Sequence, residues 1–471
     1  MGIRDRGLVA SFGLAAALVA VGGRAGSGPA PGPEERWIGD AIPTFSRLYR
    51  TSCSTCHLAP PKLNVLGEAF RLNGYRFPKN DALLREVEAV PLGAEAWKQA
   101  WPRAIWPGEL PAVPPLAIRL INDAQWTADE TESFDWTYRF PAEVSLLSAV
   151  ALDDRISAFA EVEWSPEDEV EVGQARIRFE VPLRFLPERS LYLGVGKQNL
   201  RLLSFADPQL DRIARERLLW QDIDPEELRL VAVDGSSPAP EDVAPPLVQP
   251  AISVEGIVSR RWSYGVGLAQ GAANLGIDEN DAKDLYWRVA LKLGGLAFDG
   301  TYDEVESVPP VGPGQLFDRG VVLEHFGYRG RAPGPEGADD EHWTWGAAAR
   351  WMSGPLEVGA GYVRGQRDDP WGIDPPVGLE WESAFGRLEW FAWPWLAASL
   401  KAETFRASLD RPNGAALASA DRTRVLPGLV ALIRPNIRAV AEGSLWLEHD
   451  SAEAAGLALP HDLWFRLDVA F

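Results

Sequence analysis

Cys53, Cys56 and His57 form the pattern C-x-x-C-H, and Cys53 and Cys56 are the only cysteines among 471 residues. Two thiols at this spacing can bond to the two vinyl groups of one porphyrin, and the adjacent imidazole can then bind the iron. The pattern predicts one covalently bound haem c, attached through Cys53 and Cys56, with His57 as axial ligand of the iron. A redox-active disulfide would need a thioredoxin-like context, and a zinc site would need a second ligand pair nearby. The sequence offers neither.

The second axial ligand of that iron is open, because no Met or His lies between Leu58 and Pro115. A water molecule could occupy the position. The protein candidates are Lys62, Lys79, Asn64 and Tyr75 close to the motif, and His325, His342, His449, His461 and Met352 farther along the chain. For each distant residue, an ordinary place in a loop or strand is the simpler interpretation.

Three short helices are expected to hold the motif in a small all-α c-type cytochrome domain. Pro43 and Pro61 suit the first turn of a helix, and the Asn-Asp pair at 80–81 could cap a third. After Pro61 apolar residues recur at helical spacing, and the Asn-Gly pair at 73–74 is typical of a helix end. The segment 97–115, rich in Pro and Trp, indicates a linker that leaves this domain.

Residues 1–25 have the pattern of a secretory signal peptide. Arginines precede a run of mostly Leu, Ala and Val, and Gly23-Arg24-Ala25 offers a small-residue cleavage site. An uncleaved membrane anchor is the alternative, but the apolar run is short for a spanning helix. We therefore expect export, with the haem domain and its linker over 26–115 and a second domain over 116–471.

The overall charge restricts the class of partner. The formal net charge is −21 at pH 7, whereas binding to nucleic acid depends on a basic surface that neutralises phosphates. The composition therefore argues against nucleic acid as a partner. After the first 25 residues, no apolar run approaches the length that a transmembrane helix needs.

From residue 116 onward the hydrophobic period changes to two. Residues 174–181, 284–293, 396–405 and 437–447 alternate apolar side chains with polar or charged ones. This alternation predicts strands with one apolar face and one polar face. A soluble sandwich would pack the apolar faces together. A transmembrane barrel would instead turn them to lipid and line its lumen with charged residues.

The end of the chain favours the transmembrane barrel. Apolar residues alternate from Leu463 to a terminal Phe471, the form of the outer-membrane assembly signal, and 20 tryptophans suit aromatic girdles. About seventeen segments resemble strands, whereas such barrels have an even number of them. We predict an antiparallel barrel of about 16 strands, with 18 as the alternative. The irregular region 199–250 is the expected source of the extra segment.

A haem attached to an outer-membrane barrel indicates a way to move electrons through an insulating layer about 30 Å thick. The protein must then carry the redox centre within that layer. The haem domain could lie inside the barrel as a plug or face the periplasm. Because one haem passes one electron at a time, the expected function is conduction between an extracellular donor and a periplasmic acceptor.

The haem segment resembles the fused monohaem cytochrome–porins of the bacterial outer membrane, best known as iron(II) oxidases. The resemblance rests on Ala41, Pro43, Phe45, Arg47, Cys53, Cys56, His57, Pro61, Leu63, Asn64, Gly67, Phe70, Gly74 and Tyr75. It implies that the two cysteines and the histidine bind haem and that the porin encloses the cytochrome. It also implies a framework role in the haem domain for Pro61, Leu63, Asn64, Gly67, Phe70 and Tyr75. It also implies extracellular Fe(II) as donor and a periplasmic c-type cytochrome or copper protein as acceptor. Over the barrel the resemblance is architectural only.

Two other functions stay open. A solute porin with a haem-containing plug would have an open lumen and a conductance that is independent of the haem redox state. A haem sensor or peroxidase would have an open axial site that binds CO or turns over peroxide. Acidic clusters such as 339–341 could concentrate Fe(II) at the outer face, although acidic loops also serve solubility.

Overall fold

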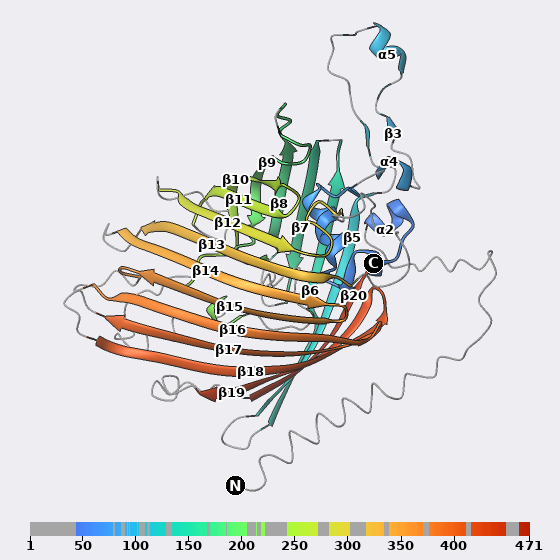
Figure 1. Cartoon of the computed structure of the whole chain (residues 1–471). Coiled ribbons are helices and arrows are strands. Elements are labelled where there is room, and N and C mark those ends of the chain that lie inside the picture. Colours follow the sequence, from blue (N-terminus) through green and yellow to red (C-terminus); the bar gives the residue numbers. More distant parts are fainter. Residues whose placement is uncertain are drawn as a thin grey trace, which may run out of the picture. The chain divides into compact units, whose positions relative to one another are not determined.

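A computed structural model of the chain shows a closed β-barrel with the C-x-x-C-H segment against its inner wall (Figure 1). The structure describes residues 44–471 apart from 79–80, 86–89, 92, 94, 101, 103–108, 111–113, 129–133, 154, 167–169, 185, 205–212, 214–217, 222–242, 272–281, 302–316, 334–338, 371–375, 411–415 and 449–460. The predicted signal peptide, the helix start at Pro43, and the candidate ligands Lys79 and His449 lie outside the described residues.

The N-terminal part is a series of short elements. These are α2 (Thr44–Tyr49), the 3₁₀ turn η1 (Cys53–Thr55), β1 (His57–Ala59), β2 (Lys62–Leu63), α3 (Val65–Leu72), α4 (Asp81–Leu84), β3 (Val90–Pro91), α5 (Glu95–Ala100) and β4 (Glu109–Leu110). None of the helices in the described part is long and apolar enough to cross a membrane.

The prediction of an all-α domain is wrong in detail. Directly after the motif, β1 and β2 form a small antiparallel ladder, with His57 opposite Leu63. The helix expected from Pro61 begins at Val65 instead, because the side chain of Asn64 accepts hydrogen bonds from the first helical amides. Strands β3 and β4 form a second ladder farther along. The described helices are therefore joined by short extended segments.

Sixteen antiparallel strands form the barrel. They are β5 (Leu116–Ala128), β6 (Phe134–Ala151), β7 (Ile156–Trp164), β8 (Glu171–Glu180), β9 (Tyr192–Asn199), β10 (Val248–Val258), β11 (Trp262–Ala269), β12 (Asp284–Leu293), β13 (Arg319–Pro333), β14 (Asp339–Ser353), β15 (Leu356–Arg367), β16 (Gly378–Trp393), β17 (Leu396–Asp410), β18 (Ala416–Arg434), β19 (Ile437–Glu448) and β20 (His461–Ala470).

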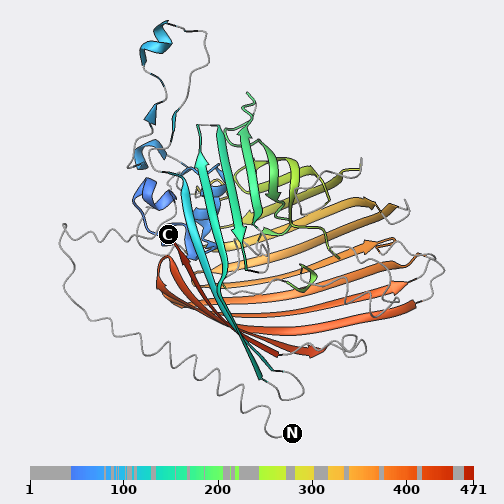
Figure 2. The ribbon, with the colours of Figure 1, turned by 180° about the vertical axis from the view of Figure 1, so that it is seen from behind.

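Each strand pairs with its sequence neighbours, and the last strand closes the barrel on the first (Figure 2). In β20, Ala470 lies opposite Arg119 of β5, and His461 lies opposite Ala128. The predicted barrel of 16 strands is therefore confirmed. The connection 200–247 contains one 3₁₀ turn, η3 (Leu219–Gln221), among its described residues and supplies no strand to the barrel.

The two faces of the strands follow the predicted alternation. In β12, Leu285 is 43% exposed and Trp287 is 41% exposed, whereas the neighbouring Tyr286 and Arg288 are buried. Large apolar side chains recur on the outward face of many strands, and buried ion pairs lie on the inward face. This distribution is the reverse of that in a soluble protein, where charged residues are almost never fully buried unless paired.

The described part of the lumen contains two kinds of packing. Around the N-terminal segment the wall is rich in paired charges. Toward the other end, residues of the connection 200–247 pack with inward-facing apolar residues of β12 to β17. This apolar layer contains Leu200, Leu202, Leu203, Leu218, Leu219, Trp220, Val243, Tyr286, Phe326, Tyr328, Val363, Trp381, Phe385, Phe405 and Leu409. The alternation predicted a lumen that is lined with charged side chains throughout. The structure has such a lining around the N-terminal segment, whereas this apolar layer fills the part toward the other end.

The two ends of the barrel have different connections. One end carries the tight turns 259–261, 354–355, 394–395 and 435–436, together with the start of β5 and the end of β20. We call it the turn end, although 181–191 and 294–318 are longer connections there. The opposite end carries 200–247 and is called the loop end.

Candidate functional site

The motif lies in a tight loop that is held by its own backbone. Ser52 precedes η1 and its hydroxyl accepts a hydrogen bond from the amide of Ser54 (3.4 Å). The amide of Cys56 donates to the carbonyl of Cys53 (3.1 Å), which closes one turn. The two cysteines are therefore separated by a single 3₁₀ turn, the short spacing that attachment to one porphyrin requires.

Asn64 fixes this loop to helix α3. Its Oδ1 accepts from the amides of Leu66 (3.0 Å) and Gly67 (2.9 Å), which caps the helix. Its Nδ2 donates to the carbonyl of Thr55 (3.0 Å) within the motif loop. Because one side chain bonds both elements, the cap of α3 also sets the position of the motif.

Gly67 allows the motif loop to lie directly on α3. A Cβ atom at this position would be 2.1 Å from the carbonyl oxygen of Cys56. That oxygen already accepts a hydrogen bond from the amide of Asn64 (2.9 Å). Any larger residue at 67 would therefore displace the backbone of the motif, which explains a glycine inside a helix.

The environment of His57 suits a neutral imidazole that could bind a metal. Its Nδ1 lies 3.1 Å from the carbonyl oxygen of Pro61. A carbonyl can only accept, so Nδ1 carries the proton and Nε2 keeps its lone pair. Burial lowers the pKa of His57 to about 4, against a smaller opposing effect of backbone hydrogen bonds. The imidazole is thus held in the tautomer that a metal ligand requires.

The two cysteines are free thiols in an environment that disfavours thiolate. Burial raises the pKa of Cys56 to about 12, and the neighbouring Cys53 contributes to the increase. Burial also raises the pKa of Cys53. Redox-active and zinc-binding cysteines depend on the thiolate, so this environment argues against both of those alternatives.

A cavity of about 640 Å³ opens beside the motif and is lined by Cys53, Cys56 and His57. Its size lies within the range of ordinary ligand and cofactor pockets. An aromatic wall surrounds part of it, formed by Phe45, Phe70, Tyr75 and Phe159, with Tyr75 stacked on Phe45 at a centroid distance of 5.5 Å. Cationic side chains of the barrel line the rest, including Arg119, Arg176, Lys197 and Arg438.

This combination fits a haem. The thiols and the imidazole lie at one side of the cavity, aromatic rings could contact the porphyrin faces, and arginines could pair with carboxylates such as its propionates. Two buried polar atoms at the same cavity, Trp220 Nε1 and Gln221 Oε1, have no hydrogen-bond partner in the described part of the chain. A bound molecule with polar groups would relieve that cost.

Among the nearby candidates for a second axial ligand that the structure describes, Tyr75 is buried at this cavity, where its hydroxyl interacts with Arg176 of the wall. The ammonium of Lys62 is held by two glutamates, and Asn64 caps α3. Tyr75 lines the cavity together with His57 and has a left-handed backbone, with φ of 62°. Such strained positions often occur at functional sites.

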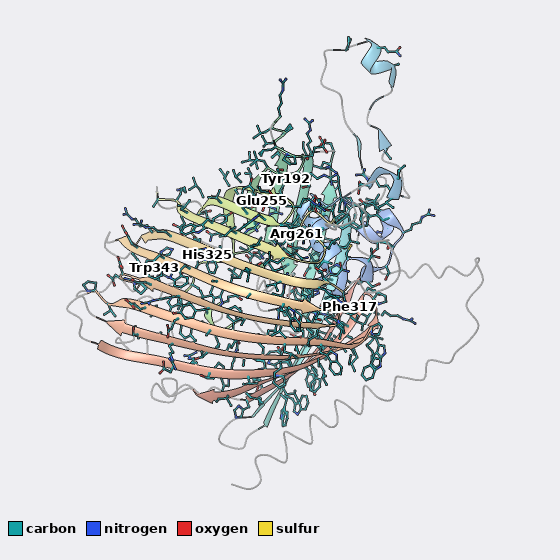
Figure 3. All side chains as sticks on the ribbon, in the orientation of Figure 1. Tyr192, Glu255, Arg261, Phe317, His325 and Trp343 are labelled. Atoms are coloured by element: carbon teal, nitrogen blue, oxygen red, sulfur yellow. The ribbon has the colours of Figure 1, made fainter. Side chains whose placement is uncertain are left out.

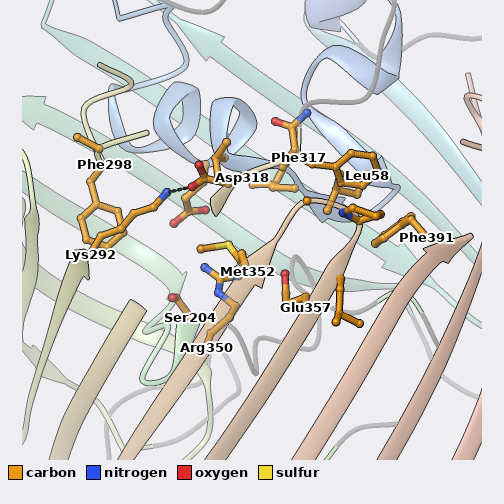
Figure 4. A pocket seen from close by; sticks show the side chains of 18 of the residues that line it. Leu58, Ser204, Lys292, Phe298, Phe317, Asp318, Arg350, Met352, Glu357 and Phe391 are labelled. Atoms are coloured by element: carbon orange, nitrogen blue, oxygen red, sulfur yellow. Dashed lines mark ion pairs between the residues drawn. The ribbon is translucent and has the colours of Figure 1, made fainter. Parts of the chain in front are cut away.

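The described distant candidates do not line this cavity. His325 is exposed on β13 (Figure 3), and His461 is exposed at the start of β20. His342 stacks on Tyr328 with ring centroids 5.9 Å apart. Met352 lines a separate cavity of about 50 Å³, which includes the ion pair of Lys292 and Asp318 (Figure 4).

Lys62 anchors the N-terminal segment to the barrel wall. Its Nζ lies 2.8 Å from Oε1 of Glu357 on β15 and 2.6 Å from Oε2 of Glu389 on β16, and the lysine is 0% exposed. Arg387 completes the cluster, 2.9 Å from Glu357 and 3.4 Å from Glu389. A buried lysine with two carboxylates is fully compensated, so this contact fixes position strongly.

Two further contacts from the barrel reach the same segment. Arg178 on β8 donates to the carbonyls of Arg71 (3.0 Å) and Leu72 (3.1 Å) at the end of α3. Arg201, at the start of the connection 200–247, pairs with Glu68 at 3.1 Å. The motif is therefore positioned by the barrel and its connection as well as by its own helix. We call residues 44–84 the plug segment.

Sequence reasoning missed the wall residues that complete the site. Glu357, Glu389, Arg438 and Trp220 line or anchor the cavity region, but in sequence they are ordinary members of alternating strands or of an irregular loop. The inward orientation of Glu357, Glu389 and Arg438 was predictable from the alternation, whereas Trp220 lies in the connection 200–247, where no alternation applies. Which of them meet the motif depends on barrel closure, and no local pattern carries that information.

No family model and no curated protein matches this chain. Solved structures with similar folds are outer-membrane proteins. OmpT of Vibrio cholerae in its trimer form has a TM-score of 0.48 at 10% identity over 76% of this chain and 98% of that chain. OmpF of Salmonella typhi in complex with daunomycin has 0.48 at 8% identity over 76% and 97%. The channel DcaP of Acinetobacter baumannii has 0.43 at 9% identity over 76% and 96%.

Proposed function

We propose that this protein is an outer-membrane electron conduit in which one haem c, bound by Cys53, Cys56 and His57, lies within a porin-like barrel. The observation that carries the proposal is the position of the C-x-x-C-H loop. It lines a cavity inside a closed barrel and is anchored there by the buried Lys62 cluster.

The membrane location rests on the distribution of side chains. Apolar residues cover the outward face, and charged residues are paired on the inward face. A closed barrel leaves no unpaired strand edge, so its backbone can cross lipid. Short turns at the end that holds both barrel termini are typical of the periplasmic side, which makes the loop end extracellular.

The haem would supply one-electron chemistry, and the protein residues would determine where it lies. Cys53 and Cys56 would hold it covalently, and the neutral His57 would bind the iron through Nε2. The aromatic wall would exclude water from the ring. An extracellular reductant, most simply Fe(II), would give its electron from the loop end. A periplasmic c-type cytochrome or copper protein would take it at the turn end.

A solute porin with a haem-containing plug is the second candidate. The polar part of the cavity favours it, because Glu143, Glu161, Arg119 and Lys197 line a volume large enough for a small solute. A closed barrel is also compatible with solute passage whether or not a haem is bound. A haem sensor or peroxidase is the third, and the cavity beside Tyr75 is where its ligand would bind.

Orientation-defined proteoliposomes separate these functions. They would contain the haem-loaded protein and an enclosed electron acceptor, with anaerobic Fe(II) added at the extracellular face. Reduction of the haem α-band followed by reduction of the enclosed acceptor supports conduction. A haem that dithionite reduces but excess Fe(II) does not would remove Fe(II) as donor. Solute flux that is insensitive to the haem redox state would instead support the porin.

A further inference from the structure

Trp220 connects the haem cavity with the apolar layer at the loop end. It lies in η3 of the connection 200–247, is 1% exposed, and lines the same cavity as Cys53, Cys56 and His57. The connection 200–247 therefore does more than occupy space in the lumen, because its Trp220 side chain borders both the cavity and the apolar layer.

The indole of Trp220 belongs to a row of four stacked rings. Its centroid lies 6.2 Å from that of Phe326 on β13 and 6.2 Å from that of Trp381 on β16, at interplanar angles of 22° and 12°. Trp381 in turn stacks on Phe405 of β17 at 6.0 Å and 23°. All four rings are buried, so the row is a dense aromatic path within the lumen.

The row crosses the lumen in the half that is nearer the loop end. The strand register places Phe326 of β13 and Phe405 of β17 at one level, and Trp381 lies two residues closer to the loop end, near Gly378, where β16 begins. Trp220 therefore lies between the cavity and the end of the barrel at which an extracellular donor would arrive.

Packing alone does not explain an indole at this position. Trp220 Nε1 is buried, and no described group accepts a hydrogen bond from it. A buried tryptophan usually satisfies its N–H, and leaving that group unmet costs about 1–3 kcal/mol. A phenylalanine would fill much of the space without this cost. The indole therefore does more than fill space: its N–H could bond to a molecule in the cavity, and its ring stacks on Phe326 and Trp381.

We propose that Trp220 and Trp381 form the electronic bridge between the extracellular end of the barrel and the haem. The inference rests on the proposed function. In the step, one electron leaves an extracellular Fe(II), which becomes Fe(III), and reduces one ferric haem to ferrous haem. The two indoles conduct by close contact and are not themselves oxidised, so no proton or bond is exchanged.

The first test measures the stacking itself, without haem. The stacked indoles of Trp220 and Trp381, 6.2 Å apart, should contribute to an exciton couplet in the far-ultraviolet circular dichroism of the folded barrel, together with the stacked pairs Trp126–Trp136 and Trp393–Trp395. We expect W220F and W381F to reduce the couplet by the same amount, because each removes one partner of the same pair. The couplet should be unchanged in W390F, because Trp390 lies on β16 with Trp381 but is 50% exposed on the outward face. A couplet that neither W220F nor W381F changes would overturn the proposed pair.

The second test measures electron entry in haem-loaded proteoliposomes. W220L should slow haem reduction by extracellular Fe(II) about tenfold or more, which corresponds to about 1.4 kcal/mol of added barrier. W220F should keep most of the rate, and W390L should keep all of it. Haem content, the haem spectrum and the midpoint potential should be unchanged in W220L, which shows that the haem site is intact.

The outcomes distinguish two failures. If Fe(II) at the extracellular face does not reduce the wild-type haem, the proposed function fails. If the wild type is reduced and W220L is reduced equally fast with an intact haem spectrum, only the bridge is refuted. If W220L does not fold, W381L removes the other indole of the pair and decides the bridge through the entry rate, while W220F and W381F decide the stacking through the couplet.

Discussion

Replacing Lys62 with Met tests how the plug segment is held in the barrel. The substitution keeps an unbranched apolar side chain and removes the positive charge between Glu357 and Glu389. The two carboxylates are almost fully buried, with side-chain exposures of 8% and 1%. They would then lose their closest cation in an environment where water cannot replace it.

The magnitude follows from the burial. Removing one partner of a buried ion pair costs about 3–5 kcal/mol. Arg387 remains within 2.9 Å of Glu357 and 3.4 Å of Glu389, which places the expected loss at the lower limit. A loss of about 3 kcal/mol raises the population of the undocked plug segment roughly 150-fold. Solvent screening reduces this loss of free energy only slightly, because the side chains of Lys62, Glu357 and Glu389 are all buried.

Limited proteolysis from the turn end measures that population. In the regime where opening and closing are fast, the cleavage rate of the plug segment follows the free energy of opening. The double variant K62M/E389Q removes one uncompensated carboxylate and should recover part of the loss. K283M is the matched control, because Lys283 is exposed. Cleavage of K62M at the wild-type rate, with the barrel folded, would falsify the view that this cluster anchors the segment.

Three further changes probe the site. Replacing both Cys53 and Cys56 with Ala should abolish covalent haem in a pyridine haemochromogen assay, while the barrel keeps its heat-modifiable migration; haem that survives denaturation would contradict the assignment. G67A should destabilise the plug segment by about 1–3 kcal/mol through overpacking, because the new Cβ meets the Cys56 carbonyl at 2.1 Å. G386A, where nothing lies closer than 4.0 Å, should not change the cleavage rate. Y49F removes a 2.7 Å hydrogen bond to Asp81 and should cost about 1–2 kcal/mol in the same assay.

The barrel was predictable because its signal is local. Alternation along β12 already separates Leu285 and Trp287 from Tyr286 and Arg288, and a period of two has only one structural meaning. The helix start was predicted at Pro61 and lies at Val65, because a β-ladder and the Asn64 cap compete for the same residues. Asparagine before an apolar run is itself a start signal, so this error was avoidable.

The contacts that complete the site could not be predicted in the same way. Lys62 is 295 residues from Glu357 and 327 residues from Glu389 in sequence, and only barrel closure brings them together. From the sequence alone Lys62 was a candidate iron ligand, because the sequence does not show which groups its side chain contacts. Alternation shows that a residue faces inward, but not which inward residue it meets.

The packing of the lumen also bears on the choice between functions. A solute pore is limited by the space left between side chains, whereas electron transfer benefits when that space is filled by protein. In this barrel the plug segment lies among paired charges near the turn end, and the connection 200–247 forms an apolar layer nearer the loop end. Trp220 borders the cavity beside the C-x-x-C-H motif from within that layer. The same features that narrow the route for a hydrated solute shorten the gap that an electron must cross, and this argues for conduction.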